Sequence, residues 1–495
     1  MTVQALLPHA PLVDRLRPIL AAETLPVYLV GGTVRDALLG RPIHDIDLIV
    51  ASGAIPLTFR VAKALDLPAY VLDDERDVGR IVVPGQELTL DFARFRGPNL
   101  EDDLRGRDFT INAMALPIEG HTTDDIIDRH DGLGDLAARR IHSIHENTLT
   151  DDPIRALRAA RFAAQLDFAL TPETAAAVRA AAPLLPSRAS PERTRDELSR
   201  VLTTGSPHTG IALLQELGVL DHVLPEVDVL AEYDQSPPHH ENVFRHTLSV
   251  LRFLAKIDAL IMTQVAVAAE DWALAVDTLL SPHRRALQDH LATPIDGQIP
   301  ARLLLMWGGL LHDIGKSATQ TIEPDGRIRF LGHDEKGAIV AGKRLSFFSF
   351  SNEARQRGRR IVEGHMRPLF LANDRRVPSR RTIYRYFRDL GPAGIDVALL
   401  SIADHFATYE GSRVDESWES LRAVLDALLD TYFNGYEETI APPRLLDGRE
   451  IMDELGLAPG QEIGRIVRLL EEAQAAGEVA SRVEALAFVH RVHVQ

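Results

Sequence analysis

The stretch that decides the fold runs from Leu29 to Val50 and reads LVGGTVRDALLGRPIHDIDLIV. An apolar β-run turns at Gly31 and Gly32, continues into a helical segment, and is followed by a second β-run that carries Asp45 and Asp47. A strand, two glycines and a helix together bring backbone N–H groups up to an anion. The pattern predicts an α/β region that holds a triphosphate at the glycines, although alone it also fits a tight turn without a ligand.

The acidic residues of the second β-run add a metal to this prediction. Asp45 and Asp47 are two apart in a strand, so they project from the same face. Two carboxylates on one face of an apolar strand repel each other unless a divalent cation joins them, and oxygen ligands beside phosphates suit Mg²⁺. Asp91, on another predicted strand, could complete a two-metal site; the alternative is an ion pair with Arg94 or Arg96.

The predicted elements change along the chain. Roughly the first 115 residues alternate short β-rich runs with helical stretches. From about residue 151 onward the segments are amphipathic and rich in Ala, Leu and Arg, with capping residues and Pro breaks. These shifts predict an α/β head over residues 1–140, followed by three all-α parts over residues 141–235, 236–410 and 411–495.

Composition narrows the class of protein. The chain has 495 residues, a formal net charge of −17 and 45% hydrophobic residues, which is typical of a multidomain globular protein. Because it has no cysteine, any metal must be held by His, Asp and Glu. The N-terminal segment MTVQALLPHAPLVDRL lacks signal-peptide features, and no apolar run approaches the ~20 residues of a membrane span. We expect a cytoplasmic protein without a membrane partner.

Basic residues gather in two stripes despite the negative net charge. The first stripe is Arg355, Arg357, Arg359 and Arg360; the second is Arg375, Arg376, Arg380, Arg381, Arg385 and Arg388, interleaved with Tyr384, Tyr386 and Phe387. Clustered Lys and Arg give affinity for a phosphate backbone, so either stripe could form a local groove for nucleic acid. A solvated helical face is the commoner origin of such a pattern.

Five motifs in order resemble the class II tRNA nucleotidyltransferase and poly(A) polymerase family. The stretch at residues 29–50 resembles the signature of that family, which lies within the DNA polymerase β-like superfamily. RDFTINA (107–113) is similar to its ribose-recognition motif, DGLGDL (131–136) to its head-to-neck hinge, DDPIR (151–155) to its nucleobase-reading motif, and SPERTRDE (190–197) to the motif that buttresses the reading helix. The resemblance implies a polymerase β-like head followed by a helical neck.

The nucleobase-reading motif also has a physical interpretation. Asp152 and Arg155, three apart on a predicted helix, lie on one face, where the carboxylate can accept from an exocyclic amine and the guanidinium can donate to ring acceptors. An ordinary ion pair has the same spacing, and Asp151 stands where the family usually has Glu. The resemblance assigns catalysis to Asp45, Asp47 and Asp91, and nucleotide binding to Gly31, Gly32, Arg35, Arg107, Asp108, Asn112, Asp152, Arg155, Arg158 and Arg161.

One departure from the family pattern bears on which nucleotide is added. Members that add all of CCA, or A alone, carry a longer flexible loop before the ribose motif, whereas here only GPNLEDD (97–103) separates Arg96 from Leu104. By the resemblance, a short loop implies addition of CC to the 3′ end of tRNA from CTP with Mg²⁺. A separate A-adding enzyme would then supply the last nucleotide. Full CCA addition, A addition from ATP and poly(A) synthesis stay open.

Scattered His and Asp residues predict a second metal site. They follow the H…HD…H…H…D pattern and resemble the HD phosphohydrolase superfamily. Burial of adjacent His312 and Asp313 is costly without a metal, and imidazole with carboxylate suits a divalent transition metal or Mg²⁺. The resemblance implies a first ion on His246, His312, Asp313 and Asp404, a second on His333 and His365, and a phosphate contact from Lys316; His239, His240 and His405 are not expected to be ligands.

The last part of the chain and the overall function leave alternatives. LLDGREI (445–451) and the helical segments after it resemble the family's tRNA-binding tail, although a plain packing domain fits equally well. A different class of function would be an HD phosphodiesterase or phosphatase with an RNA-gripping head. A non-catalytic RNA-binding protein is disfavoured, because a binding module gains nothing from unpaired buried carboxylates.

Overall fold

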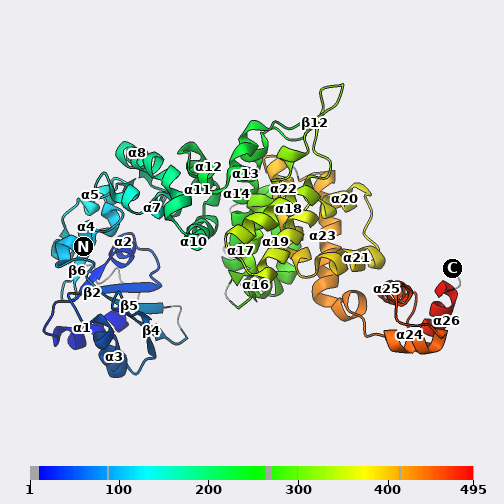
Figure 1. Cartoon of the computed structure of the whole chain (residues 1–495), viewed down its shortest axis with the longest axis horizontal. Helices are drawn as coiled ribbons and strands as arrows, with labels where there is room; N and C mark the ends of the chain where they lie inside the picture. Colours follow the sequence, from blue (N-terminus) through cyan, green and yellow to red (C-terminus); the bar gives the residue numbers. More distant parts are fainter. Residues whose placement is uncertain (1–9, 86–87, 264–269, 298, 412–413, 494–495) are drawn as a thin grey trace. The chain divides into compact units, whose positions relative to one another are not determined.

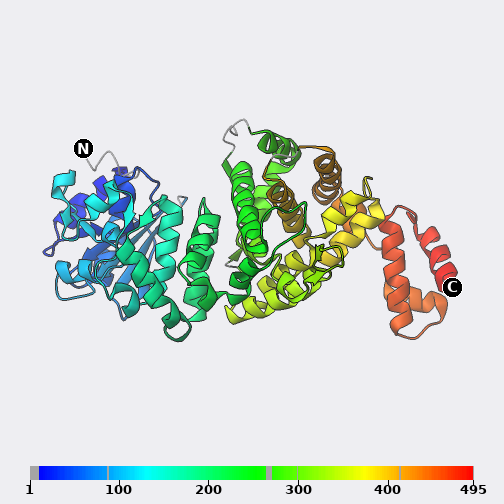
Figure 2. The same ribbon diagram turned by 90° about the horizontal axis from the view of Figure 1, so that it is seen from above.

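A computed structural model of the protein describes residues 10–85, 88–263, 270–297, 299–411 and 414–493 (Figures 1 and 2). Residues 1–9, on which part of the cytoplasmic expectation rests, lie outside the described residues. The chain forms two compact units. The first consists of Met1–Ser190 with Glu216–His222, and the second of Pro191–Gln215 with Val223–Gln495.

The first unit is built on a seven-stranded mixed sheet, drawn mainly in blue in Figure 1. Across the sheet the strands are β3 (Ala69–Asp73), β4 (Val78–Val83), β5 (Leu88–Arg94), β2 (Asp45–Val50), β1 (Tyr28–Val30), β6 (Met114–Pro117) and β7 (Ile127–Asp128). Strands β2 and β5 are parallel, and the other neighbours are antiparallel. The register sets Asp47 beside Asp91, and Asp91 beside Arg80 on β4.

Alternation along the strands separates the core from the polar residues. Leu88, Leu90 and Phe92 of β5 are buried, so Asp91 belongs to the opposite face. Helix α3 (Ala54–Leu65) packs against β4 and β5, and α2 (Gly32–Leu38) packs against β1, β2 and β6. Helix α1 (Ala10–Ala21) packs against α3.

Short helices lead from the sheet into the predicted neck. They are α4 (Leu100–Arg105), α5 (Gly132–Ala137), α6 (Thr148–Asp151), α7 (Ile154–Leu166), α8 (Pro172–Ala181) and α9 (Leu185–Arg188). Three two-stranded ladders add to the parts predicted as all-α: β8 (Arg140–Ile141) with β9 (Ala169–Leu170), β10 (Pro294–Ile295) with β11 (Ile299–Pro300), and β12 (Thr321–Ile322) with β13 (Ile328–Arg329). Strands of two residues are too short to show a sequence period, so they could not be predicted.

The second unit is helical around α22 (Ala393–Thr408), which is buried along its whole length. Helices α14 (Val243–Thr263), α17 (Ala301–Leu311) and α19 (Asn352–Gly364) pack against it. The remaining helices of this helical part are α10 (Pro191–Leu202), α11 (Pro207–Glu216), α13 (Pro225–Asp228), α15 (Asp271–Leu280), α16 (Arg284–Ala292), α18 (His333–Phe347), α20 (Arg367–Asn373), α21 (Arg380–Leu390) and α23 (Glu416–Asn434). Helix α12 (Leu220–Val223) begins in the Glu216–His222 segment of the first unit.

The C-terminal helices have an apolar cluster of their own. Helices α24 (Gly448–Leu455), α25 (Gln461–Ala475) and α26 (Arg482–His493) enclose buried Ile451, Ile466 and Val489. The predicted fold class, an α/β head followed by helical parts, is therefore confirmed. None of the helices in the described residues is long and apolar enough to cross a membrane.

The second basic stripe is occupied by contacts within this unit. Tyr384, Tyr386 and Phe387 of α21 are buried, so the aromatic residues of the stripe belong to the core. The arginines between and around them meet α25: Arg381 and Arg385 pair with buried Glu472, and Arg380 donates to the carbonyl oxygen of Ala475. Carboxylates and carbonyls of the chain thus take up much of the stripe's hydrogen-bonding capacity.

Candidate active sites and metal centre

The carboxylates of β2 are tied to the turn that precedes α2. The hydroxyl of Thr33 donates to the carbonyl oxygen of Asp45 (3.2 Å) and accepts from the backbone N–H of Asp47 (2.8 Å). The Asp45 carboxylate also accepts from the hydroxyl of Thr89 at 2.6 Å. The glycine turn and the DxD strand, predicted to act together, are thus joined through one threonine.

Asp47 sits in an environment that opposes its charge. Burial raises its pKa from 3.8 to about 6, and the nearby Asp91 and Asp45 carboxylates add to the increase, while Arg107 counteracts it. A bound cation would stabilise the ionised form of this carboxyl group, because it offsets the repulsion between the neighbouring carboxylates. The electrostatics therefore fit a divalent metal at Asp45 and Asp47.

Gly31 allows the chain to approach these groups closely. Its φ of 65° lies in the left-handed region, where residues other than glycine are strained. A Cβ at this position would also lie 2.9 Å from a guanidinium nitrogen of Arg107 and 3.7 Å from a carboxylate oxygen of Asp47. The turn thus requires glycine for both its backbone conformation and its contacts.

Asp91 has a partner that the sequence analysis did not name. Its two oxygens accept from Nε and Nη2 of Arg80, at 2.7 and 2.6 Å, in a bidentate pair. The expected alternatives, Arg94 and Arg96, are therefore wrong as partners. Cross-strand register explains the pair, because Arg80 on β4 lies directly beside Asp91 on β5.

A buried chain of hydrogen bonds links the first two motifs to the neck. Arg35 donates to the side-chain oxygen of Asn112 (2.6 Å), Asn112 donates to Asp108 (3.0 Å), and Arg158 donates to Asp108 (2.7 Å). Burial opposes ionisation of Asp108, but Arg158 and Asn112 hold its pKa below the usual value. The ring of Phe162 completes the cluster: the guanidinium carbons of Arg35, Arg158 and Arg161 lie 5.0, 5.4 and 4.4 Å from its centroid.

The nucleobase-reading pair is arranged differently from the prediction. Asp152 lies between α6 and α7 with φ −136° and ψ 93°, so the two residues are not on one helical face. The following Pro153 explains the break, because a residue before proline disfavours the helical conformation. Arg155 donates to the carbonyl oxygens of Gly106 (2.8 Å) and Arg107 (3.1 Å), which ties the start of α7 to the ribose motif.

The short loop before the ribose motif is folded into helix α4. Asn99 caps this helix by accepting from the backbone N–H of Asp102 at 2.9 Å. Buried Asp103 accepts from Nε and Nη2 of Arg107 (3.0 and 2.9 Å), and it also accepts from the backbone N–H of Arg96 at 3.0 Å. The segment that the sequence analysis singled out by its length is therefore fixed at both ends.

The predicted HD residues converge on Asp313 in the second unit. The carboxylate of Asp313 lies 3.2 Å from Nε2 of His312 and 3.4 Å from Nε2 of His333. Nε2 of His365 and of His246 are 3.8 and 3.9 Å from the same carboxylate. Asp404 of α22 lies 3.0 Å from Nε2 of His246. All six side chains, drawn from five segments, are buried.

Backbone carbonyls orient three of the histidines. Nδ1 of His312, His333 and His365 lies 2.9, 2.7 and 2.7 Å from the carbonyl oxygens of Gly309, Phe330 and Val362. Because Nδ1 is engaged, Nε2 of each ring is presented to Asp313, the arrangement by which proteins preset histidine ligands. The backbone carbonyls thus orient the three Nε2 atoms toward Asp313.

A close backbone approach holds the HD segment against α18. A Cβ on Gly315 would lie 2.1 Å from the carbonyl oxygen of His333 and 2.6 Å from the backbone nitrogen of Gly337. No real side chain tolerates such distances. Glycine at position 315 therefore sets the separation between His312-Asp313 and His333.

The charges of this cluster fit a metal centre. Burial and the neighbouring His312 and His333 lower the pKa of His365 to about 4, so the ring is neutral and able to ligate. Burial opposes ionisation of Asp313, but His312 and Lys316 hold its pKa far below the usual value. His246–His312–Asp313 and Asp313–His333–His365 each place donor atoms within 4.8 Å of one another. These two groups share Asp313. The first contains His246 and His312, expected for the first ion, and the second contains His333 and His365, expected for the second; Asp404 is in neither group.

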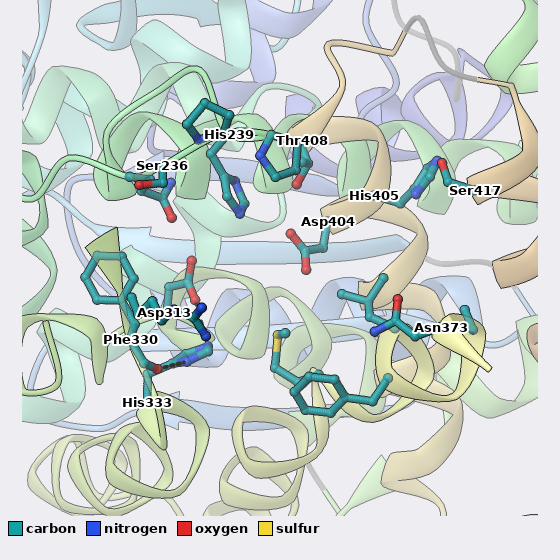
Figure 3. A pocket seen from close by; sticks show the side chains of 18 of the residues that line it. Ser236, His239, Asp313, Phe330, His333, Asn373, Asp404, His405, Thr408 and Ser417 are labelled. Atoms are coloured by element: carbon teal, nitrogen blue, oxygen red, sulfur yellow. Dashed lines mark hydrogen bonds and ion pairs between the residues drawn. The ribbon is translucent and has the colours of Figure 1, made fainter. Parts of the chain in front are cut away.

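A large cavity opens beside the cluster (Figure 3). Its volume is about 1060 Å³, and Asp313, His333 and Asp404 line it. Lys316 also lines it but donates to Asp313 and to Gln235, both at 2.7 Å. His239 reaches the same space, and burial together with His246 lowers its pKa to about 3. There is room for a substrate much larger than a phosphate group.

Comparison with known proteins identifies the family. Three family models match: the poly A polymerase head domain over residues 27–142, the probable RNA and SrmB-binding site of polymerase A over 167–230, and the HD domain over 243–409. An A-adding tRNA nucleotidyltransferase from Deinococcus radiodurans is 36% identical over 96% of this chain and 98% of the relative. This chain belongs to the tRNA nucleotidyltransferase and poly(A) polymerase family. A CC-adding tRNA nucleotidyltransferase from Thermus thermophilus is 32% identical over 93% of this chain and 92% of the relative.

Solved structures of the family share the fold. A CCA-adding enzyme in complex with ATP aligns over 100% of this chain and 99% of the other, with a TM-score of 0.63 and 20% identity. A Thermotoga maritima CCA-adding enzyme complexed with tRNA aligns over the same shares with a TM-score of 0.57. At this identity the likeness concerns the fold, which agrees with the head, neck and helical parts described above.

Three residues that position the predicted site residues were not expected from the sequence, two in the head and one beside the HD cluster. They are Arg80, which holds Asp91, Asp103, which holds Arg107, and Gln235, which holds Lys316. Asp103 stands four residues before Arg107, and such a spacing can form an ion pair, so this contact had a sequence signal. Arg80 reaches its partner through strand register, and Gln235 reaches Lys316 from an irregular segment 81 residues earlier; the sequence displays neither contact.

Proposed function

We propose that this chain adds cytidine to the 3′ end of tRNA from CTP and Mg²⁺ without a nucleic-acid template. The observation that carries the proposal is the register of β2 and β5, which puts Asp47 beside Asp91 next to the Gly31 turn. The raised pKa of Asp47 supports a cation at this place. The names of the relatives support the substrate, tRNA.

Each motif has a role in this proposal. Asp45 and Asp47 hold Mg²⁺, which when bound lowers the barrier by activating the 3′-hydroxyl and neutralising the pyrophosphate that leaves. Gly31 and Gly32 bring backbone N–H groups to the triphosphate, and the buried chain Arg35–Asn112–Asp108–Arg158 keeps the ribose motif rigid. Asp152 and Arg155 read the nucleobase, for which Arg155 exchanges the carbonyl oxygens of Gly106 and Arg107 for base acceptors.

Addition of CC is the finer part of the proposal. It is supported by the short segment that ends in helix α4, which Asn99 and Asp103 fix in place. The relatives do not decide the matter, because one is named A-adding and another CC-adding. Under CC addition a second activity supplies the terminal adenosine. Domain limits at residues 140, 235 and 410 and a cytoplasmic location belong to the same proposal.

A second activity, metal-dependent phosphohydrolysis, is favoured by the HD cluster. His246, His312, Asp313 and Asp404 are proposed to hold one ion, and His333 and His365 a second. Such an ion, when bound, supplies a nucleophile from water at neutral pH. The preset Nε2 atoms and the adjoining cavity support hydrolysis of a phosphoester, with Lys316 close enough to contact its oxygens.

Primer extension at nucleotide resolution tests the transferase. Purified protein is incubated with Mg²⁺, CTP or ATP, and tRNA transcripts that lack CCA or that end in CC. Two cytidines and no adenosine are expected. A lone adenosine or a complete CCA would overturn the CC assignment and keep the family, whereas the absence of any extension would overturn the transferase proposal and leave the hydrolase as the main activity.

A further inference from the structure

The outer face of helices α18 and α19, which lie side by side in Figures 1 and 2, carries a basic groove. The helices approach closely because a Cβ on Gly342 would lie 2.7 Å from Cδ of Arg359, and one on Gly358 would lie 2.5 Å from Cδ1 of Leu345. The groove has a volume of about 480 Å³. Its polar lining consists of Lys343, Arg355 and Arg359 with the neutral side chains of Ser346, Asn352 and Gln356.

Every charged side chain that lines this groove is basic, although the chain carries a net charge of −17. Lys343 and Arg359 form no ion pair with any residue in the described ranges. Arg355 donates to the hydroxyl of Ser346 at 2.7 Å and to the amide oxygen of Asn352, which are both neutral partners. Three cations therefore share one groove without a carboxylate.

The first basic stripe thus differs from the second. Arg357 of the first stripe is buried and pairs with Asp396 at 2.7 Å, so it belongs to the core. Arg359 is exposed and Arg355 is half-buried, and both face the groove with Lys343 from the neighbouring helix. In the second stripe, by contrast, Arg381 and Arg385 are compensated by Glu472. The groove therefore keeps its positive charge available for an outside partner, whereas Arg357, Arg381 and Arg385 do not.

We propose that this groove binds the phosphate backbone of the RNA substrate. Guanidinium forks match phosphate oxygens, and amide and hydroxyl donors such as Asn352, Gln356 and Ser346 are typical of contacts to phosphate and sugar. The polar groups offer no built pocket for a base, so the contact is independent of sequence and depends on the release of counterions. The choice of RNA rests on the proposed function.

The salt dependence of tRNA binding tests the groove. The double variant Arg355→Gln/Arg359→Gln is compared with the control Arg285→Gln/Arg422→Gln, which changes the net charge equally but removes arginines already paired with Asp289 and Glu419. In the groove variant the slope of log K against log salt is expected to fall by about 1 to 2, with at least about tenfold weaker binding at 0.1 M salt. Lys343→Gln adds a further loss of the same kind.

Measurement of kcat distinguishes an effect on tRNA binding at the groove from an effect on catalysis at the active site. At saturating tRNA, kcat for cytidine incorporation is expected to be unchanged in the groove variant, and its melting temperature and circular dichroism should match those of the wild type. An unchanged salt slope, or an equal loss in the control, would overturn the proposal that the groove binds RNA. A wild type that binds tRNA with the expected slopes but extends none of it would refute the transferase while supporting the groove.

Discussion

The two candidate metal sites of this chain are prepared in opposite ways. In the second unit, backbone carbonyls aim three histidines at Asp313, and two groups of donor atoms are already gathered within 4.8 Å. In the head, the carboxylates of Asp45, Asp47 and Asp91 form no such group among the described residues, and Asp91 is paired with Arg80 instead. The donor atoms of the HD cluster are already oriented for an ion. The carboxylates in the head repel one another when no cation is bound.

The difference suits the two proposed activities. A site that holds ions permanently benefits from rigid, oriented ligands. A transferase that takes up Mg²⁺ together with each nucleotide benefits from ligands that are only fully satisfied when the triphosphate arrives. Variants that remove the acidic ligands should therefore have different signatures in the two units.

The largest expected effect is on transfer itself. Asp45→Ala and Asp47→Ala should each lower cytidine incorporation at least about a thousandfold, because the ion that stabilises the charge of the transition state loses its ligand. Metal-dependent hydrolysis at the HD site should continue unchanged. Asp74→Ala, an exposed acid in the turn between β3 and β4, serves as the control. Retained incorporation in both β2 variants would dismiss the carboxylates as the catalytic pair.

The next effect concerns metal affinity in the second unit. Asp313→Asn should weaken binding of Mn²⁺ at least about a hundredfold, because both donor groups share this carboxylate. Calorimetric titration, with the thermal shift on adding Mn²⁺ as a second reading, measures the loss. His240→Ala, a nearby histidine outside both groups, should bind the ion as the wild type does. Undiminished Mn²⁺ binding by Asp313→Asn would place the metal elsewhere.

A third effect is a gain in stability. Without Mg²⁺, Asp47→Asn should raise the free energy of unfolding of the first unit by roughly 2 to 3 kcal/mol above pH 6, because the folded pKa of about 6 exceeds the value of 3.8. The wild type recovers stability as the pH falls through 6, since the folded carboxyl takes up its proton first. The gain should vanish below pH 4. Melting curves in EDTA across this range measure it, and a gain that is independent of pH would contradict the raised pKa.

The smallest expected effect tests how the HD site is preset. Gly315→Ala should destabilise the second unit by about 1 to 3 kcal/mol, because the added methyl group overlaps the carbonyl oxygen of His333. Displacement of His333 should also lower the affinity for the second ion more than the affinity for the first. Gly205→Ala, where a Cβ would meet nothing within 4 Å, is the matched control. Denaturant unfolding compares the two; equal stability of both variants would show that α18 adjusts freely.

The elements of the head could be predicted because each is a local pattern. The alternation in DIDLIV, together with the glycine turn before α2, predicts β2 and its two carboxylates from neighbouring residues alone. The candidate HD residues were predictable from order and residue type, and the structure brings their side chains together; that they ligate a metal stays a prediction. The register that sets Arg80 beside Asp91 was not predictable, since it depends on how β4 and β5 are aligned.

In the nucleobase motif the sequence does carry the signal for the observed break. The prediction that Asp152 and Arg155 share one helix is wrong because Pro153 disfavours a helical conformation of the residue before it. The two basic stripes show the opposite case. The two stripes have similar sequences, but their arginines face different helices. Arg385 pairs with Glu472, whereas the groove that contains Arg359 is lined by no carboxylate.

The sequence positions of the candidate HD ligands bear on how the protein folds. His246 and Asp404 lie 3.0 Å apart in space although α14 and α22 are separated by most of the helical part of the chain. Contacts of this kind have a high contact order and form late, after the intervening helices have closed the loop. A bound ion at this site would therefore join segments that are far apart in the sequence, so it would stabilise only the folded arrangement of this unit.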